Sequence, residues 1–401
     1  MPVDLGGTLA TGIHGATYLR LKEALGISGG ETRINEPFQF LAEIEAPVKD
    51  ALHIDTFGLF PPSTMFGYRN ENWKPFTFTD GTTVKVSGNM QWDVLENGDI
   101  VQYPRGDRSA APSGRMPKGG SFFDTIIRQE PIVEEELDAK EFARQTFSLY
   151  TEEECRRLEE TTKWVYDNTD YSIVGSFMGA SFSRLTEIMG PFIANPKGIR
   201  APEEWFMSFL LRKDYIREIH ELQYEIGMKN LEMYKQAVGD RIDVVLMSGT
   251  DFGTQTGLMF GTNIYREFFK EFHSKMNGWV HENTDWKTFY HTCGSIRELL
   301  DDFYEAGIDI LNPVQVSAAG MDPRFLKDNY GSKFVFWGGG VDTQNILPFE
   351  SEANVRKYVR EMLEIFAPGG GYVFSTVHNI QDKVPIGNVV AAFDEVARFR
   401  Y

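Results

Sequence analysis

His291 and Cys293 form the pair of residues that points most directly to chemistry. They are two positions apart in a segment that reads as the end of a strand, so their side chains are expected on one face. An imidazole and a thiolate on one face are two ready ligands for Zn²⁺. A catalytic zinc site needs a third protein ligand and one open position, and His378, after another expected strand, is the candidate. The alternative is that Cys293 fills space in the core and that His291 is a core residue or a general acid–base.

Other polar side chains also lie in or after expected strands, where they are candidates for catalysis or substrate contact. Asp251 is a candidate proton donor, and His378 is a candidate catalytic residue as well as a ligand. The candidate substrate-binding residues are Asp55, Gln255, Asn312, Gln315 and Asp342. Each has a structural interpretation too, because an Asp can cap a helix or shape a turn and an amide can brace a loop.

The elements that must position these residues alternate between strand and helix. Strands are expected at residues 171–178, 242–248, 287–292, 308–312, 333–337 and 372–377, with helical segments between them. This alternation predicts a parallel sheet with crossover helices. With residues 52–57 as a further strand, the count of about seven favours an α/β fold of the (β/α)8 TIM-barrel type, although an eighth strand is not evident. An open doubly wound sheet is the alternative.

Residues 74–104 have a different pattern. Their apolar residues alternate in period two, and Asp80-Gly81 and Asn97-Gly98 are hairpin turn signals. This predicts an antiparallel β-meander inserted near the N-terminus of a single TIM-barrel domain covering residues 1–401. Residues 105–120 are rich in Gly, Pro and Ser and are expected to form a loop.

Composition limits the classes of function. The chain has 401 residues and a formal net charge of −18, which disfavours nucleic acid and an anionic membrane surface as partners. It contains no apolar run of about 18 residues, so no membrane span is expected. Two cysteines in a chain of this length do not make a disulfide framework, and a cytoplasmic location is expected.

Four motifs in the C-terminal half carry a family resemblance. They are FYHTCGS at 289–295, EAGIDILNPVQ at 305–315, FWGGGVD at 336–342, and VHNI at 377–380 with Pro385 and Asn388. Their order and spacing over residues 170–401 resemble the uroporphyrinogen decarboxylase superfamily. That superfamily contains the porphyrinogen decarboxylase and the zinc methyltransferases of corrinoid-dependent systems, such as the methylcobalamin:coenzyme M methyltransferases. The resemblance implies a (β/α)8 barrel.

The resemblance covers both activities, and the decarboxylase also has a histidine at the position of His378. The methyltransferases bind zinc through a His-x-Cys pair and a later Cys, which here correspond to His291, Cys293 and the position of His378. The decarboxylase carries paired arginines in an N-terminal segment that binds substrate carboxylates. The matching segment here, residues 2–8, has no Arg and contains Asp4; we expect it at the barrel mouth.

We therefore predict a zinc-dependent methyltransferase that moves a methyl group between a small thiol or O-methyl compound and a corrinoid. The corrinoid is expected on a partner protein in trans, and a homodimer is compatible with the sequence. One alternative is a cofactor-free decarboxylase of uroporphyrinogen or a related acid, with His378 and Asp55 as polar or proton-transfer groups. The other is a non-catalytic barrel that binds a tetrapyrrole or corrinoid.

Overall fold

A seven-stranded parallel sheet forms the centre of the molecule in the computed structural model, which describes residues 1–399. The sheet order is β15-β14-β13-β12-β11-β10-β3. Its strands are β3 (Thr56–Leu59), β10 (Ser172–Ser176), β11 (Val244–Ser248), β12 (Lys287–His291), β13 (Ile310–Asn312), β14 (Val335–Trp337) and β15 (Tyr372–Val373). Neighbours in the sheet are consecutive in this series and run parallel, so the predicted alternation of strand and crossover is confirmed.

The N-terminal residues connect the two edge strands of this curled sheet. On one side the Asp4 N–H donates to the Phe374 carbonyl at 2.8 Å and the Phe374 N–H donates to the Pro2 carbonyl at 3.0 Å. On the other side the Asp55 N–H donates to the Val3 carbonyl at 2.9 Å. Residues 2–4 therefore lie between β15 and β3, in the position that an eighth strand would take. The sequence gives no strand signal there because the pairing is a single bridge.

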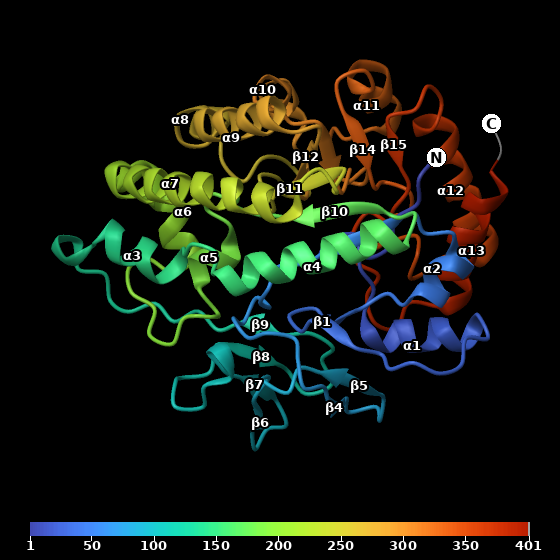
Figure 1. Ribbon diagram of the computed structural model, residues 1–401, viewed down its shortest axis with the longest axis horizontal. Coiled ribbons are helices and arrows are strands. Elements are labelled where there is room, and N and C mark those ends of the chain that lie inside the picture. Colours follow the sequence, from blue (N-terminus) through green and yellow to red (C-terminus); the bar gives the residue numbers. More distant parts are fainter. Residues whose placement is uncertain (400–401) are drawn as a thin grey trace.

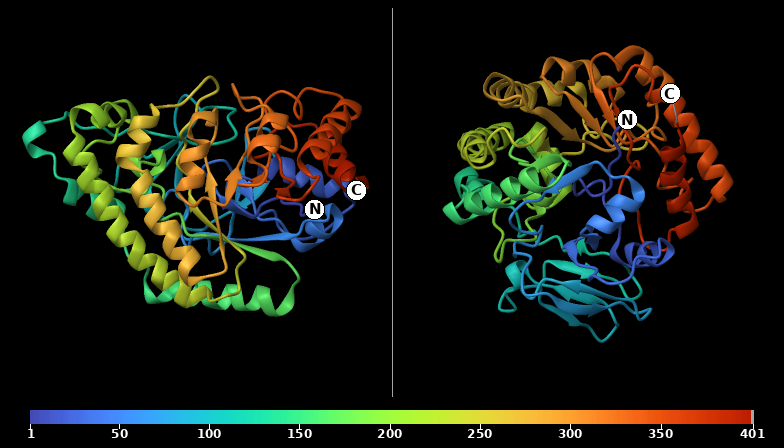
Figure 2. Two further views of the ribbon diagram at one scale, coloured as in Figure 1. Left: turned by 90° about the horizontal axis from the view of Figure 1, so that it is seen from above. Right: turned by 45° about the vertical axis from the view of Figure 1, so that its right-hand side comes forward.

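Helices cover the outer face of the sheet (Figures 1 and 2). Local sequence explains several of their starts: a capping box of Thr151 and Glu154 begins α4, and Asp322 caps α11 ahead of Pro323. The helices are α1 (Gly15–Ala24), α2 (Ala46–Leu52), α3 (Ala139–Thr146), α4 (Glu152–Asn168), α5 (Leu185–Met189), α6 (Pro202–Leu211), α7 (Lys213–Val238), α8 (Thr262–Phe268), α9 (Lys270–Asn283), α10 (Leu300–Glu305), α11 (Pro323–Tyr330), α12 (Glu352–Phe366) and α13 (Ile386–Arg398).

Side chains of the parallel strands divide into two buried layers. The inner layer is a separate apolar cluster made of Val174, Val244, Leu246, Phe289, Ile310, Trp337 and Val373. Residues that alternate with these, such as Tyr290 and Leu311, belong to the larger core between the sheet and the helices. Because strand side chains alternate between faces, His291 shares the inner face of β12 with Phe289.

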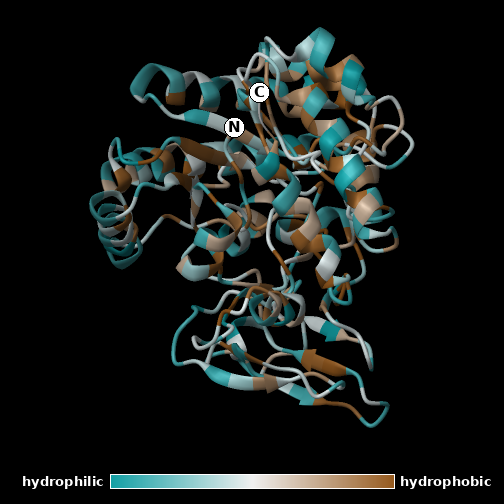
Figure 3. Ribbon diagram, turned by 90° about the vertical axis from the view of Figure 1, so that its right-hand side faces the viewer, coloured by the Kyte–Doolittle hydropathy of each residue, from teal (hydrophilic) through white to brown (hydrophobic). Residues whose placement is uncertain are grey.

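The antiparallel region is larger than the predicted meander. It consists of β4 (Lys74–Thr77) paired with β5 (Thr83–Val86), and a four-stranded sheet of β6 (Trp92–Val94), β7 (Ile100–Gln102), β8 (Gly114–Met116) and β9 (Asp124–Thr125). The boundary at residue 104 is wrong, and β8 interrupts the loop predicted for 105–120, because β8 pairs with β7 through short polar segments that lack period-two hydrophobicity. The region lies to one side of the barrel (Figures 2 and 3).

This antiparallel region and the short pair β1 (Ile34–Glu36) and β2 (Leu41–Ala42) share an apolar cluster of their own. Phe40, Phe66, Phe76 and Phe123 are fully buried in it. The neighbouring segments at Phe38 and Met65 continue from this cluster to the carboxyl end of the barrel, where they line a cavity described below.

The strand predicted at residues 52–57 begins later than expected. α2 extends to Leu52, His53 turns the chain with a φ of 53°, and β3 begins only at Thr56. Asp55 therefore precedes the amino end of β3. In residues 1–399 no helix combines the length and apolar character required to cross a lipid bilayer.

Candidate metal centre

His291, Cys293 and His378 converge at the carboxyl end of the sheet. One ligand atom from each residue lies within 4.8 Å of the ligand atoms of the other two. The Cys293 Sγ is 3.4 Å from the His291 Nε2, and the two imidazole rings are edge to face with centroids 5.4 Å apart. The three side chains thus present one thiol and two imidazoles to a common point, a donor set that suits zinc.

The orientation of His291 follows from strand register. His291 on β12 is paired with Asn312 on β13, so the two side chains lie side by side on the inner face. The Asn312 Nδ2 donates to the Trp337 carbonyl at 2.9 Å, which turns the Asn312 Oδ1 toward the His291 Nδ1 at 2.6 Å. The Nδ1 must therefore carry the proton and donate it, and the Nε2 lone pair is left free for a metal.

The loop that carries Cys293 is fixed by backbone contacts. The Cys293 N–H donates to the Asp251 Oδ1 at 2.7 Å, and the Gly294 N–H donates to the Gln315 Oε1 at 2.8 Å. Gly294 has a φ of 87°, and a Cβ there would lie 2.6 Å from the Gly253 carbonyl oxygen. Glycine is required at 294 because the loops after β11 and β12 touch at this point.

His378 and Cys293 have the protonation behaviour expected of half-buried donors. Burial, followed by the adjacent His291, lowers the pKa of His378 to about 4, so its ring is neutral near pH 7. Burial, followed by the Asp251 carboxylate, raises the pKa of the Cys293 thiol well above its ordinary value. Within residues 1–399 the His378 ring makes no hydrogen bond. A ring held without a partner beside a thiol and an imidazole fits a metal ligand.

A cavity of about 240 Å³ opens next to these residues. We call it the site cavity. His291, His378 and Asp251 lie on one side of it, and the N-terminal part of the chain contributes another. Most of its wall is apolar or weakly polar: Leu9, Ala10, Phe38, Gln39, Met65, Ser176, Met178, Ser183, Leu185, Thr186, Met189, Phe206, Leu246 and Gly249. Arg184 is the remaining lining residue. Such a wall suits a small ligand with an apolar body.

Comparison with known proteins places the chain in a family. The family model for uroporphyrinogen decarboxylase (URO-D) matches residues 131–399. The chain belongs to the uroporphyrinogen decarboxylase family. A solved methyltransferase from Methanosarcina mazei is similar at 18% sequence identity with a TM-score of 0.43, over 60% of this chain and 64% of that chain. No curated protein matches the chain.

In this family member the structure separates the predicted site residues into groups. Asp251 lines the site cavity, and its Oδ1 is 3.8 Å from the His291 Nε2. Asn312 and Gln315 lie behind the ligands and hold them, rather than on the cavity wall. This bracing is the interpretation that the sequence left open beside substrate binding.

Three further candidates lie outside the cavity wall. Gln255 is exposed, and its amide donates to the Gln344 side chain at 3.0 Å. Both carboxylate oxygens of Asp342 accept hydrogen bonds inside their own turn, from Gln344 and Asn345. The position predicted for Asp55 is wrong: its carboxylate accepts from the Val3 N–H at 2.7 Å at the amino end of β3, the opposite end of the strand from the metal ligands.

Sequence reasoning missed one charged residue of the site and gave another a different position. Arg184 lies on the cavity wall, but its local sequence carries no motif that would identify it. Asp4 was expected at the barrel mouth but is fully buried, where it accepts from the Trp337 Nε1 at 2.7 Å and the Thr56 Oγ1 at 2.6 Å. Burial raises the pKa of Asp4, and these bonds tie the N-terminal segment to the barrel interior.

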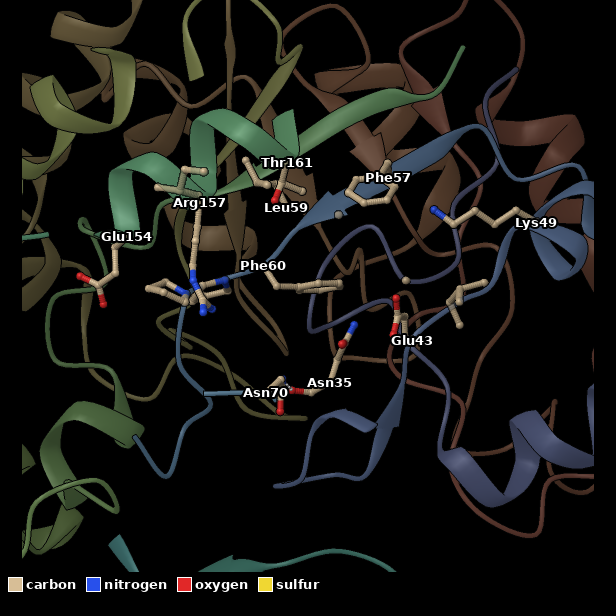
Figure 4. A pocket seen from close by; sticks show the side chains of 16 residues that line it. Asn35, Glu43, Lys49, Phe57, Leu59, Phe60, Asn70, Glu154, Arg157 and Thr161 are labelled. Atoms are coloured by element: carbon tan, nitrogen blue, oxygen red, sulfur yellow. Dashed lines mark hydrogen bonds between the residues drawn. The ribbon is translucent and has the colours of Figure 1, made fainter. Parts of the chain in front are cut away.

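A second cavity, of about 280 Å³, lies between β3 and α4 (Figure 4). Lys49 and Arg157 enter it from different sides, with Phe57 and Phe60 between them. Burial lowers the pKa of Lys49 to about 8, and its Nζ donates to the Thr56 carbonyl at 2.7 Å. Neither of the two histidines nor the cysteine of the metal centre reaches this cavity, so the site cavity is the candidate for chemistry.

Proposed function

We propose that this protein is a zinc-dependent methyltransferase that moves a methyl group between a small thiol or O-methyl compound and a corrinoid held by a partner protein. The observation that carries the proposal is the convergence of His291, Cys293 and His378 on one point beside a cavity. Membership in the uroporphyrinogen decarboxylase family supports it, because the zinc methyltransferases of corrinoid systems resemble this chain in the His-x-Cys motif.

The chemistry explains why a cation is needed at this place. When a methyl group leaves an ether or thioether for a nucleophile, the bonding electron pair stays on the oxygen or sulfur. A zinc ion held by the three side chains would supply Lewis-acid stabilisation of that heteroatom, or keep a thiol as its thiolate. The mostly apolar wall of the site cavity lowers the local dielectric constant, which strengthens electrostatic interactions within it.

The chain's own residues position the donors. Asn312 holds the His291 ring so that its Nε2 faces the site, while Asp251 and Gln315 hold the backbone that carries Cys293. Asp251 also lines the cavity, where its carboxylate is the nearest acidic group to His291. We propose that it orients the reacting part of the substrate.

The two alternative functions have less support from the described residues. A porphyrinogen carries many carboxylates, yet Arg184 is the sole lysine or arginine among the residues that line the site cavity. Residues 2–8 contain no arginine, and their Asp4 is buried in the barrel. A non-catalytic carrier would not require a thiol and two imidazoles aimed at one point.

Metal analysis of the purified chain tests the proposal. We expect about one zinc per chain, lost in Cys293→Ser and His378→Gln variants and retained in Cys155→Ser, whose partly buried thiol lies on α4. Transfer of a methyl group from methylated thiols or aryl methyl ethers to free cob(I)alamin is the activity readout. A chain that binds no zinc, or one that consumes uroporphyrinogen without metal, contradicts the proposal.

A further inference from the structure

Arg184 is the one cation on the wall of the site cavity among the residues described. Its Nη1 is 3.1 Å from the Glu187 Oε1. Within residues 1–399 its guanidinium makes no other hydrogen bond, so most of its donors are unused. A guanidinium offers five N–H donors in a planar fork, which matches a carboxylate or a similar oxyanion.

The backbone before Arg184 is strained and firmly held. Met178 and Ser183 both line the cavity and both have left-handed φ values, 64° and 56°, which are uncommon for residues other than glycine. The Ser183 Oγ accepts from the Trp205 Nε1 at 2.9 Å and lies 2.7 Å from the His220 Nε2. Strained residues that persist at a cavity wall are typical of ligand sites.

The proton positions in this network follow from its other end. The His220 Nδ1 is 3.0 Å from the Phe268 carbonyl, which can only accept, so Nδ1 carries the proton. The Nε2 must then accept from the Ser183 hydroxyl. Burial lowers the pKa of His220 to about 4, so the ring keeps this neutral form near pH 7. The network fixes the turn that presents Arg184 to the cavity.

Glu187 balances Arg184 only in part. Its second oxygen, Oε2, is buried and has no hydrogen-bond partner in the described residues, and burial raises the pKa of the carboxyl. A half-buried carboxylate in this position holds the guanidinium in place but leaves most of its donors unused. An anion entering the cavity would find unused donors at Arg184 and an apolar surface around them.

We propose that Arg184 binds a carboxylate of the substrate, and that the substrate is a small acid with an apolar body. The body would lie against the Phe and Met side chains of the cavity wall, such as Phe38 and Phe206. At its other end this acid would carry the transferred methyl group, or the thiol that receives it, and this part of the inference rests on the proposed function. The anion contact itself does not.

Binding of matched acids and amides tests the proposal. Calorimetric titration of the purified chain with para-methoxybenzoate and para-methoxybenzamide, and with 3-mercaptopropionate and its amide, compares ligands that differ in charge at one end. We expect the acid of at least one pair to bind about 10-fold to 100-fold more tightly than its amide. We expect Arg184→Gln to reduce that preference to about twofold or less, and Arg184→Lys to keep part of it.

Two controls show whether the preference for the acid comes from Arg184, from surface charge or from a metal. Arg144→Gln removes an exposed arginine of α3 and should leave the preference unchanged. Chelator-treated chain should also keep it, because the carboxylate is held by Arg184 and not by a metal. The proposal is overturned if the acids bind no better than the amides, if no acid binds at millimolar concentration, if Arg184→Gln keeps the full preference, or if chelation abolishes it. If the purified chain binds no zinc or transfers no methyl group but still prefers acids to amides, the proposed function is refuted and the anion contact of Arg184 is not.

Discussion

Replacement of Asn312 by leucine tests whether the metal centre depends on the residue behind it. Asn312 is buried and joins the His291 Nδ1 to the Trp337 carbonyl through one amide. Leucine has a similar volume but no polar atom. The Asn312→Leu variant leaves the His291 N–H and the Trp337 carbonyl unpaired, and it frees the imidazole to rotate or to change tautomer.

The expected magnitude has two parts. Loss of a residue that orients a metal-bound histidine weakens metal affinity by about 10-fold to 100-fold, or about 1.4–2.7 kcal/mol. Leaving a buried donor and acceptor unpaired lowers the free energy of unfolding by about 1–3 kcal/mol. The first effect is specific to the metal, and the second would accompany the loss of any buried amide.

A matched variant separates the two parts. Asn388 on α13 is also buried, and its Nδ2 donates to the Leu347 and Glu350 carbonyls at 2.9 Å and 2.8 Å. Asn388→Leu should lower stability in urea denaturation by a similar amount but leave zinc affinity unchanged in competition with a chromophoric chelator. Equal zinc affinity in the two leucine variants would refute the reasoning that Asn312 positions His291.

Three further predictions concern a loop glycine, two buried histidines and the thiol. Gly294→Ala should lower the free energy of unfolding by about 1–3 kcal/mol and weaken zinc binding, because the added Cβ meets the Gly253 backbone. Gly278→Ala, in the open middle of α9, should leave zinc binding unchanged. Denaturation measures the stability of both variants, and metal titration measures their zinc binding. Burial lowers the pKa values of His220 and His273 from 6.5 to about 4 and about 3, so the unfolded chain binds more protons than the folded chain below pH 6.5. The free energy of unfolding should therefore fall by about 2 kcal/mol per histidine between pH 7.5 and pH 5. Constant stability over that range in urea titrations would contradict this. Zinc must displace the proton of the Cys293 thiol, whose pKa is raised, so zinc affinity should increase about tenfold per pH unit above pH 7. A zinc affinity that does not change with pH would show that Cys293 is not a ligand.

Much of the site could be predicted because its signals are local. The two-residue spacing of His291 and Cys293 predicted a shared face, and the structure places both ligand atoms together, although β12 ends at His291 and Cys293 lies in the loop that follows. The position of His378 after another strand was enough to make it the third candidate, since parallel strands bring their carboxyl ends to one rim.

Predictions that required distances between remote segments were less successful. The position of Asp55 was wrong because its strand begins after it, at Thr56, and a shift of a few residues moves a side chain to the other end of a barrel. The segment at residues 2–4 fills the eighth strand position with a single bridge that no periodicity could reveal. The antiparallel region extends to Thr125 because pairing partners, not local pattern, keep its last strands in place.

The amino-acid sequence alone determined the alternation of strands and helices and the residue types at the strand ends, since both follow from local periodicity and spacing. Only the tertiary structure decided that Asn312 orients His291 and that Arg184 lies on the wall of the site cavity. These roles depend on strand register and on a turn held by residues far apart in the chain. Contacts of that kind are set by packing in three dimensions, and the residue types that make them are common elsewhere in the protein.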